Sequence, residues 1–489
     1  MSSGSDIYTL ELKNFINTNN YKHTPMQPLD LIIIFAYLIG LFIFAIWIGT
    51  KSNLENYLVA GRKFKTFFLV FTMASTMIGM STVLSTASAS YSSGISFAVS
   101  GLFVILAGYV VVYFFAKKIK TFGDTYKAHT MGDFFAQRYS NRVRVIAGIV
   151  IIVAYLLFFA GLLLGLSQLF QVFGGQGLFI SLIFALIGVV IYTAIAGIKS
   201  DFYTDIVHFI VMFITLAIIL LPWMIIKSGG IGAIMSKLPA GYLNIYNFAG
   251  PSFFWLVILF GAPVFLMYME IWQRIYASAD LKTVKRTLLY SALITIPFIV
   301  LAVIIGLIGR IQLPGINPDS ALLLVIKNYL PTGLIGLAVA GLIATILSTL
   351  NTVIMVISAI FIKDFYMGSI KKHASEKHYL KVGRIITFCV GISGIALAYI
   401  FPNFVELAVA ANGGVLILAP TVIGGFFWKK STERGAFWSI LSGFIVLVVS
   451  YPFLGKMSFL PACVVSLASF IGLSLMKKGK KAKKKVLTI

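Results

Sequence analysis

Long apolar segments alternate with short polar ones along almost the whole chain. Each apolar segment is long enough to cross a hydrocarbon core of about 30 Å as a helix. The pattern predicts an all-α polytopic membrane protein with about 13 transmembrane helices. Numbered in chain order, these helices are expected to begin near residues 29, 67, 96, 144, 177, 203, 250, 286, 333, 383, 404, 435 and 457.

The composition agrees with a membrane protein and excludes several other classes. Of the 489 residues, 59% are hydrophobic and only 11% are charged, which a water-soluble globular protein does not show. The net charge is +24, but the basic residues form short clusters between apolar segments, so they indicate topology rather than nucleic-acid binding. The chain lacks the GxxxxGKS or GxxxxGKT loop of nucleotide-binding proteins and the HExxH pattern of zinc hydrolases. We therefore expect no enzyme, no nucleotide and no nucleic-acid partner.

The Lys and Arg residues divide unequally between the two sides of the membrane. Alternate loops and the C-terminal tail hold 32 of the 39, and the other side holds 7. The positive-inside rule then predicts a multi-pass protein of the plasma membrane with its N-terminus outside and its C-terminus in the cytoplasm. We expect residues 1–28 to be an extracellular N-terminal segment without a cleaved signal peptide. Residues 29–476 would be the transmembrane domain, and 477–489 a basic cytoplasmic tail that contacts anionic lipid.

A stripe of hydroxyl side chains lies inside the ninth predicted helix, in the segment TILSTLNT. Thr345, Ser348, Thr349 and Thr352 follow the spacing i, i+3, i+4 and i+7, so a helix brings all four to one face. Hydroxyls in membrane helices often bond to a carbonyl one turn back or pack helix against helix. A dehydrated alkali cation also needs several oxygen ligands. From the spacing alone, helix packing and cation binding fit the stripe equally well.

Two predicted helices carry signs of interruption. Helix 2 is rich in Ser and Thr around Gly79, which weakens the helical hydrogen-bond ladder and frees backbone carbonyls. In helix 7, Gly261 and Pro263 are expected to break the run before Tyr268 and Glu270. Interrupted membrane helices in corresponding positions of two halves point to the binding site of a transporter.

Three carboxylates fall within predicted membrane helices, where charge is costly. Asp205 is followed one turn later by His208, and a cation site or proton relay is favoured there over a structural hydrogen bond. For Glu270, an ion pair with Arg274 at i+4 is favoured over a role in binding. Glu406, at the outer mouth of helix 11, is expected to be a solvated interfacial group.

Several motifs together resemble the sodium:solute symporter (SSS/SSF) family, which includes bacterial transporters of proline, pantothenate, sialic acid and sugars. The resemblance extends in order over helices 1 to 12. The stretches that carry it are ENYLVAGRK (55–63), the Ser/Thr-rich helix 2 ending in YSSGIS, AGIKSDFYTD (196–205), WQRIYASADLKTVKR (272–286), ATILSTLNT followed by KDFY, and FFWKKSTERGAFWSILSGF (426–444).

The resemblance implies a fold and a sodium site. The fold would be a LeuT-like core of two inverted five-helix repeats, at about 67–227 and 250–428. Sodium, the coupling ion, would lie between helices 2 and 9. The positions that match the family's ligands are the carbonyls of Ser75, Ile78 and Thr345 and the hydroxyls of Ser348 and Thr349.

The resemblance also implies a second cation site, present in some members, at Asp205 and Thr352. Two departures from the family bear on the chemistry. His208 stands where the family often has Gln, which leaves room for a proton. The region of Tyr268 and Met269 lacks the Asn, Asp or Gln common in the family, so the pocket has fewer amide partners than in sugar transporters.

The function implied is that of a secondary symporter, which couples inward sodium flow to uptake of a small organic solute by alternating access. The solute would be an amino acid, sugar, vitamin or monocarboxylate, because no surplus of intramembrane Lys or Arg suggests a multiply charged anion. Proton coupling through Asp205 and His208 is the alternative within transport; a passive channel or a membrane sensor is the alternative from another class. The predicted solute contacts are Thr82, Ser85, Tyr268 and Asn412.

Overall fold

The computed structural model describes residues 26–49, 61–79, 81–183, 185, 198–370, 374–401 and 403–476. Ten helical segments of this part of the chain are long and apolar enough to span a membrane, and one bent helix pair makes an eleventh. The spans are α2 (Pro28–Gly49), α6 (Ser96–Tyr126), α8 (Asn141–Gly174), α10 (Ile198–Met212) with η3 (Phe213–Leu220) and α11 (Leu221–Lys227), α13 (Gly250–Met267), α15 (Leu281–Gln312), α17 (Leu334–Ile360) with η5 (Phe361–Ile370), α18 (Glu376–Ile400), α19 (Phe404–Leu416) with α20 (Ala419–Phe427), and α21 (Glu433–Leu454). The bent pair is α4 (Thr66–Met77) with η2 (Ser81–Ser85) and α5 (Thr86–Ser93).

Shorter helices complete the described part of the chain. They are α7 (Met131–Arg138), α12 (Ile231–Ser236), α14 (Met269–Ala277), η4 (Pro318–Ser320), α16 (Ala321–Tyr329), η6 (Gly455–Ser458) and the apolar α22 (Phe459–Leu475). The all-helical fold is as predicted, and α22 matches the last predicted helix. The helix predicted to begin near residue 177 falls partly on residues outside those described, so thirteen spans stay a prediction. Most of the predicted N-terminal segment and the whole of 477–489 also lie outside the described residues.

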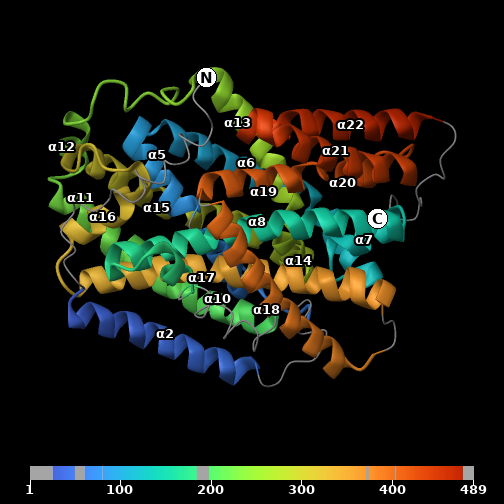
Figure 1. Ribbon diagram of the computed structural model, residues 1–489, viewed down its shortest axis with the longest axis horizontal. Helices are drawn as coiled ribbons and strands as arrows, with labels where there is room; N and C mark the ends of the chain where they lie inside the picture. Colours follow the sequence, from blue (N-terminus) through green and yellow to red (C-terminus); the bar gives the residue numbers. More distant parts are fainter. Residues whose placement is uncertain are drawn as a thin grey trace.

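The central helix of the molecule is α17 (Figure 1). Of an 18-residue stretch in the span Leu334–Gly368, 94% is buried, compared with 17% for α2, which lies at the edge. A helix that is apolar on all sides is stable either in lipid or inside a protein, and the burial of Thr345, Ser348, Thr349 and Thr352 decides between the two. The hydroxyl stripe therefore faces protein, and lipid is excluded from it.

Asp30 of α2 closes the N-terminus of α17. Its Oδ1 accepts the N–H groups of Gly333 at 2.7 Å and Gly336 at 2.8 Å. The first N–H groups of a helix lack intrahelical partners and carry partial positive charge, so a carboxylate stabilises them. A Cβ on Gly336 would lie 2.7 Å from the Asp30 Cα, so glycine permits this approach. The peripheral α2 is thus held against the central helix.

The interruption predicted near Gly79 is confirmed. α4 ends at Met77, and Ile78 has φ −85° and ψ 60°, outside the helical region. The chain resumes at Ser81 as a short π-helix, and the two helical halves meet at an angle of 57°. The carbonyls in the last turn of α4 are therefore available to groups other than the helix's own N–H groups.

The interruption predicted at Gly261 and Pro263 is wrong in position. α13 continues through both residues and ends at Met267, where Tyr268 takes an extended conformation (φ −70°, ψ 115°) before α14 begins. Proline in a membrane helix is tolerated when surrounding protein satisfies the freed carbonyl. Gly261 instead serves close packing, because a Cβ there would lie 2.8 Å from a methyl group of Val104 on α6.

The start of α4 and the end of α14 are joined through their backbones. The Phe64 N–H donates to the Ala277 carbonyl at 3.1 Å, and the Ala279 N–H donates to the Phe64 carbonyl at 3.0 Å. Lys120 of α6 adds a bond from Nζ to the Ser278 carbonyl at 2.7 Å. The two broken helices are thereby fixed to each other at one end of the molecule.

Candidate functional site

The hydroxyl stripe of α17 bonds directly to the broken end of α4. Ser348 Oγ donates to the Ser75 carbonyl at 3.0 Å, and Thr349 Oγ1 donates to the Thr76 carbonyl at 3.2 Å. All four residues are buried. These carbonyls can accept from α17 because α4 ends two residues later and leaves them without a complete helical ladder.

Thr345 adds a third carbonyl to the same place. It accepts from Ser348 Oγ at 3.0 Å and from Thr349 Oγ1 at 3.3 Å, whereas the Thr345 hydroxyl turns back to the Leu342 carbonyl at 2.7 Å. Two hydroxyls and three backbone carbonyls, including that of Thr76, thus converge within hydrogen-bonding distance. The Thr76 carbonyl was not among the residues predicted.

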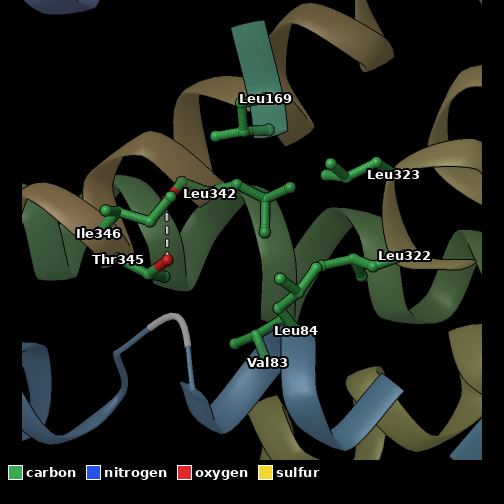
Figure 2. Close-up of a pocket in the computed structure, with 8 residues that line it drawn as sticks. All are labelled: Val83, Leu84, Leu169, Leu322, Leu323, Leu342, Thr345 and Ile346. Carbon is green, nitrogen blue, oxygen red and sulfur yellow. Dashed lines mark hydrogen bonds between the residues drawn. The ribbon is translucent and has the colours of Figure 1, made fainter. Parts of the chain in front are cut away.

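Thr345 also borders an apolar cavity of about 10 Å³ (Figure 2). This volume is at the lower limit for one water molecule, and a water there would need two or more polar partners. The walls are almost wholly aliphatic and come from η2, α8, α16 and α17, so water is excluded on this side. The lining residues are Val83, Leu84, Leu169, Leu322, Leu323, Leu342, Thr345 and Ile346.

Gly79 and Ser75 complete the surroundings of these oxygens. A Cβ on Gly79 would lie 2.8 Å from Thr349 Oγ1, so the absence of a side chain allows the break in α4 to approach the stripe. Ser75 Oγ is buried and has no hydrogen-bond partner among the described residues, and Ile78 is fully buried at the end of α4. A buried cluster of neutral oxygens, in which the Ser75 hydroxyl has no partner among the described residues, suits a small dehydrated cation.

A second polar cluster lies one helical turn along α17, around Asp205 of α10. Asp205 Oδ2 forms a fully buried ion pair with Arg274 Nη2 at 2.8 Å. It also accepts from the hydroxyls of Thr72 at 2.5 Å and Thr76 at 3.3 Å. Arg274 Nη2 donates further to Thr76 Oγ1 and to Thr352 Oγ1, the latter at 3.3 Å. The structure therefore brings Asp205 and Thr352 together, with a guanidinium between them.

Asp201 belongs to this cluster and was not predicted. Its Oδ2 accepts from Thr352 Oγ1 at 3.0 Å, and its side chain is buried. The signal was present in the sequence, because Asp201 and Asp205 are spaced i and i+4 and share a helix face. The predicted start of helix 6 near residue 203 left Asp201 outside the membrane helix, whereas α10 begins at Ile198.

His208 faces the peripheral helix α2. Its Nδ1 lies 2.5 Å from the Tyr37 hydroxyl, and the ring is fully buried. Asp205 bonds through Oδ2 to α4 and α14. The two side chains predicted as a proton relay are thus engaged with different helices.

The predicted ion pair between Glu270 and Arg274 is wrong. Arg274 reaches across to Asp205, and its Nη1 donates to the backbone carbonyl of Glu270 at 3.3 Å. The Glu270 carboxylate instead accepts from the hydroxyl of Tyr155 on α8. The same hydroxyl accepts the Met269 N–H at 2.8 Å, which satisfies the first N–H of α14. Tyr155 therefore fixes the break between α13 and α14 from the side of α8.

Two of the predicted solute contacts meet at this break. The Tyr268 hydroxyl donates to Asn412 Oδ1 at 2.9 Å, and both side chains are partly exposed. The Thr82 hydroxyl bonds within its own segment, to the Met77 carbonyl at 3.1 Å. Ser85 lies at the end of η2 and is partly exposed.

The sequence of the chain matches the model of the sodium:solute symporter family over residues 57–443. The chain belongs to this family. Members of the family are membrane transporters and not enzymes, and sodium is their coupling ion. The chain is 24% identical over 469 residues to the sodium/pantothenate symporter of Escherichia coli (strain K12), covering 91% of the chain and 96% of that protein. It is 23% identical over 487 residues to the sodium/proline symporter of the same strain, covering 94% of each.

Solved structures share the symporter's fold. A Na⁺-coupled sialic acid symporter in a substrate-bound, outward-open state superposes with a TM-score of 0.80 at 18% identity, covering 94% of this chain and 99% of that one. Mhp1, a nucleobase-cation-symport-1 family transporter, gives a TM-score of 0.58 at 15% identity over 86% of this chain and 95% of that one. The LeuT-like fold predicted for the core is thereby confirmed.

Proposed function

We propose that the symporter couples sodium bound between α4 and α17 to the uptake of a small organic solute. One observation carries the proposal: the hydroxyls of Ser348 and Thr349 meet the carbonyls of Ser75 and Thr345 where α4 is broken. A packing contact between two helices needs no break in either of them. The break in α4 leaves the carbonyl of Ser75 without a complete helical ladder, so that it can face a cation beside the carbonyl of Thr345. The carbonyl of Ile78 is the remaining ligand of the proposed site.

Sodium would act by joining two parts that move relative to each other. α4 belongs to the first proposed repeat, at about 67–227, and α17 to the second, at about 250–428. A ligand shifts a conformational equilibrium only through its different affinity for the two states. Sodium that bridges α4 and α17 favours the state in which these oxygens are close, and this couples the ion to alternating access.

The solute is proposed to bind beside the two helix breaks. Tyr268 and Asn412 lie at the break between α13 and α14, and Thr82 and Ser85 lie just after the break that follows α4. Their hydroxyl and amide groups suit an amino acid, sugar, vitamin or monocarboxylate. The relatives named above transport pantothenate, a carboxylate, and proline, an amino acid, which supports a small solute with few charges.

We propose the plasma membrane as the location, with the N-terminus outside and the C-terminus in the cytoplasm. The proposal rests on the Lys and Arg bias between the two sides. Anionic lipid would contact the basic residues 477–489, which lie outside the described residues.

Uptake into proteoliposomes tests the coupling ion. The solute would first be chosen by a thermal-shift screen of purified protein over the four solute classes, in sodium and in choline chloride. We expect an inward sodium gradient to drive accumulation above equilibrium, and an inward pH gradient without sodium to drive none. Accumulation with the pH gradient alone would support proton coupling, and equilibration without accumulation would indicate a channel.

A further inference from the structure

α19 and α20 meet at a joint formed by Ile417 and Leu418, where the helical hydrogen-bond ladder is incomplete. Pro420, in the first turn of α20, has no N–H to donate one turn back. The Thr421 N–H, which would serve the Ile417 carbonyl in a continuous helix, donates to the Leu418 carbonyl at 3.1 Å. The Ile417 carbonyl can therefore accept a hydrogen bond from another helix.

Ser466 of α22 supplies that hydrogen bond. Its hydroxyl donates to the Ile417 carbonyl at 2.7 Å. Ser439 Oγ of α21 lies 2.9 Å from Ser466 Oγ and 2.8 Å from the Ser466 carbonyl. All three residues are 0% exposed, so loss of the Ser466 hydroxyl would leave a buried carbonyl without a partner. The hairpin of α21 and α22 thus contacts the joint directly (Figure 1).

Glycines allow the helices to approach closely around the joint. A Cβ on Gly443 of α21 would lie 2.9 Å from Ser466 Cβ and 3.3 Å from Ile417 Cβ. A Cβ on Gly413 of α19 would lie 2.9 Å from the Cβ of Phe459, the first residue of α22. Because closely packed interiors transmit small displacements, a shift of α22 at the joint would reach α19.

α20 is held separately, by α7. Arg138 of α7 donates through Nε to the Gly425 carbonyl at 2.7 Å and through Nη2 to the Trp428 carbonyl at 3.1 Å. The hydroxyl of Tyr139 donates to the Thr421 carbonyl at 2.8 Å. α20 is therefore attached to α7 near both of its ends, and the direction in which α19 leaves α20 depends on what holds the joint.

We propose that Ser466 is a positioning residue of the solute site. By holding the Ile417 carbonyl, Ser466 sets the direction of α19 and keeps Asn412 Oδ1 at 2.9 Å from the Tyr268 hydroxyl. The proposal rests on the proposed function, because Asn412 and Tyr268 are proposed solute contacts. It extends that function by giving a role in solute binding to the hairpin of α21 and α22, which lies outside the two proposed repeats.

Hydrogen–deuterium exchange of the purified full chain, followed by mass spectrometry in sodium chloride without solute, tests this role. We expect Ser466→Ala to raise the exchange rate of the α19 backbone amides about fivefold, because a hydrogen bond that holds this helix is lost. The amides of α20 are expected to keep their exchange rate, since α7 still holds that helix.

Ser469→Ala is the matched control. Ser469 lies nearly one turn further along α22 and accepts a hydrogen bond from the Ser442 hydroxyl of α21 at 3.0 Å, so its loss weakens only the hairpin. We expect this variant to change exchange in α21 and α22 and not in α19. Unchanged exchange of α19 in Ser466→Ala, or equal increases in the two variants, would overturn the proposal and leave Ser466 as a packing contact.

Uptake into proteoliposomes, with L-proline and pantothenate as radiolabelled probes, gives the functional readout. For a probe that the unmodified protein accumulates, we expect Ser466→Ala to raise the half-saturating probe concentration about fivefold. The maximal rate, and the sodium dependence at saturating probe, should stay unchanged, and Ser469→Ala should match the unmodified protein. A lower maximal rate with an unchanged half-saturating concentration would contradict a positioning role. Accumulation of neither probe by the unmodified protein would count against the proposed solutes, and the exchange measurement would still decide the role of Ser466.

Discussion

Alanine at Ser348 and Thr349 is expected to raise the sodium concentration for half-maximal uptake by at least about tenfold per residue. Each substitution removes one oxygen ligand from the cluster. Both residues are buried, so a water molecule from solvent cannot take the place of that oxygen. Hydrogen bonds to charged groups contribute about 1.5–3 kcal/mol, which we take as the scale for one ligand oxygen, and about 1.4 kcal/mol corresponds to a factor of ten. Uptake measured over a sodium titration in proteoliposomes gives the shift.

Ser358→Ala is the matched control for these variants. Ser358 is another buried hydroxyl of α17, but it lies 3.3 Å from the Thr387 hydroxyl of α18 and not beside α4. We expect its sodium dependence to equal that of the unmodified protein. If the variants at Ser348 and Thr349 also keep that dependence, the stripe only packs helices together.

Breaking the buried ion pair is expected to have the largest effect on stability. Asp205→Ala or Arg274→Ala leaves one charge buried without its partner, which costs about 3–5 kcal/mol. Both residues are fully buried, so solvent cannot compensate for the lost partner. The melting temperature of the purified protein in detergent, measured by differential scanning fluorimetry, should fall for each single variant.

The neutral pair Asp205→Asn with Arg274→Gln separates charge from packing. Because it removes both charges and nearly conserves volume, we expect it to recover most of the melting temperature lost in the single variants. A melting temperature of the double variant close to that of the unmodified protein would show that the single variants lose stability because of an unpaired buried charge. Equal melting temperatures for the single variants and the double variant would show that the pair adds no charge-dependent stability.

The sequence carried enough information to locate the break in α4 and the stripe on α17. Both depend on local features: Gly79 among small polar residues, and hydroxyls at helical spacing. The position of the second break was not predicted, because whether Pro263 ends a helix depends on what surrounds α13. The break falls instead at Tyr268, where the hydroxyl of Tyr155 from α8 accepts the Met269 N–H and Asn412 holds the Tyr268 hydroxyl.

The ion-pair partner of Arg274 is determined by contacts between helices and not by spacing along α14. Spacing along one helix suggested Glu270, but the fold brings Asp205 of α10 to 2.8 Å from Arg274. Asp201 was missed because a helix boundary was set five residues too late, although its spacing from Asp205 was visible. A spacing rule detects neighbours on one helix, and it cannot rank them against groups that another helix brings in.

An experimental density map of the symporter in sodium, compared with one in choline, would show whether sodium binds between α4 and α17. We expect a density peak, in sodium only, within coordination distance of the carbonyls of Ser75 and Thr345 and the hydroxyls of Ser348 and Thr349. The hydroxyl bond from Ser348 to the Ser75 carbonyl should then be replaced by contacts to the ion. Identical maps at these residues in both salts, with sodium-driven uptake intact, would show that the coupling sodium binds elsewhere.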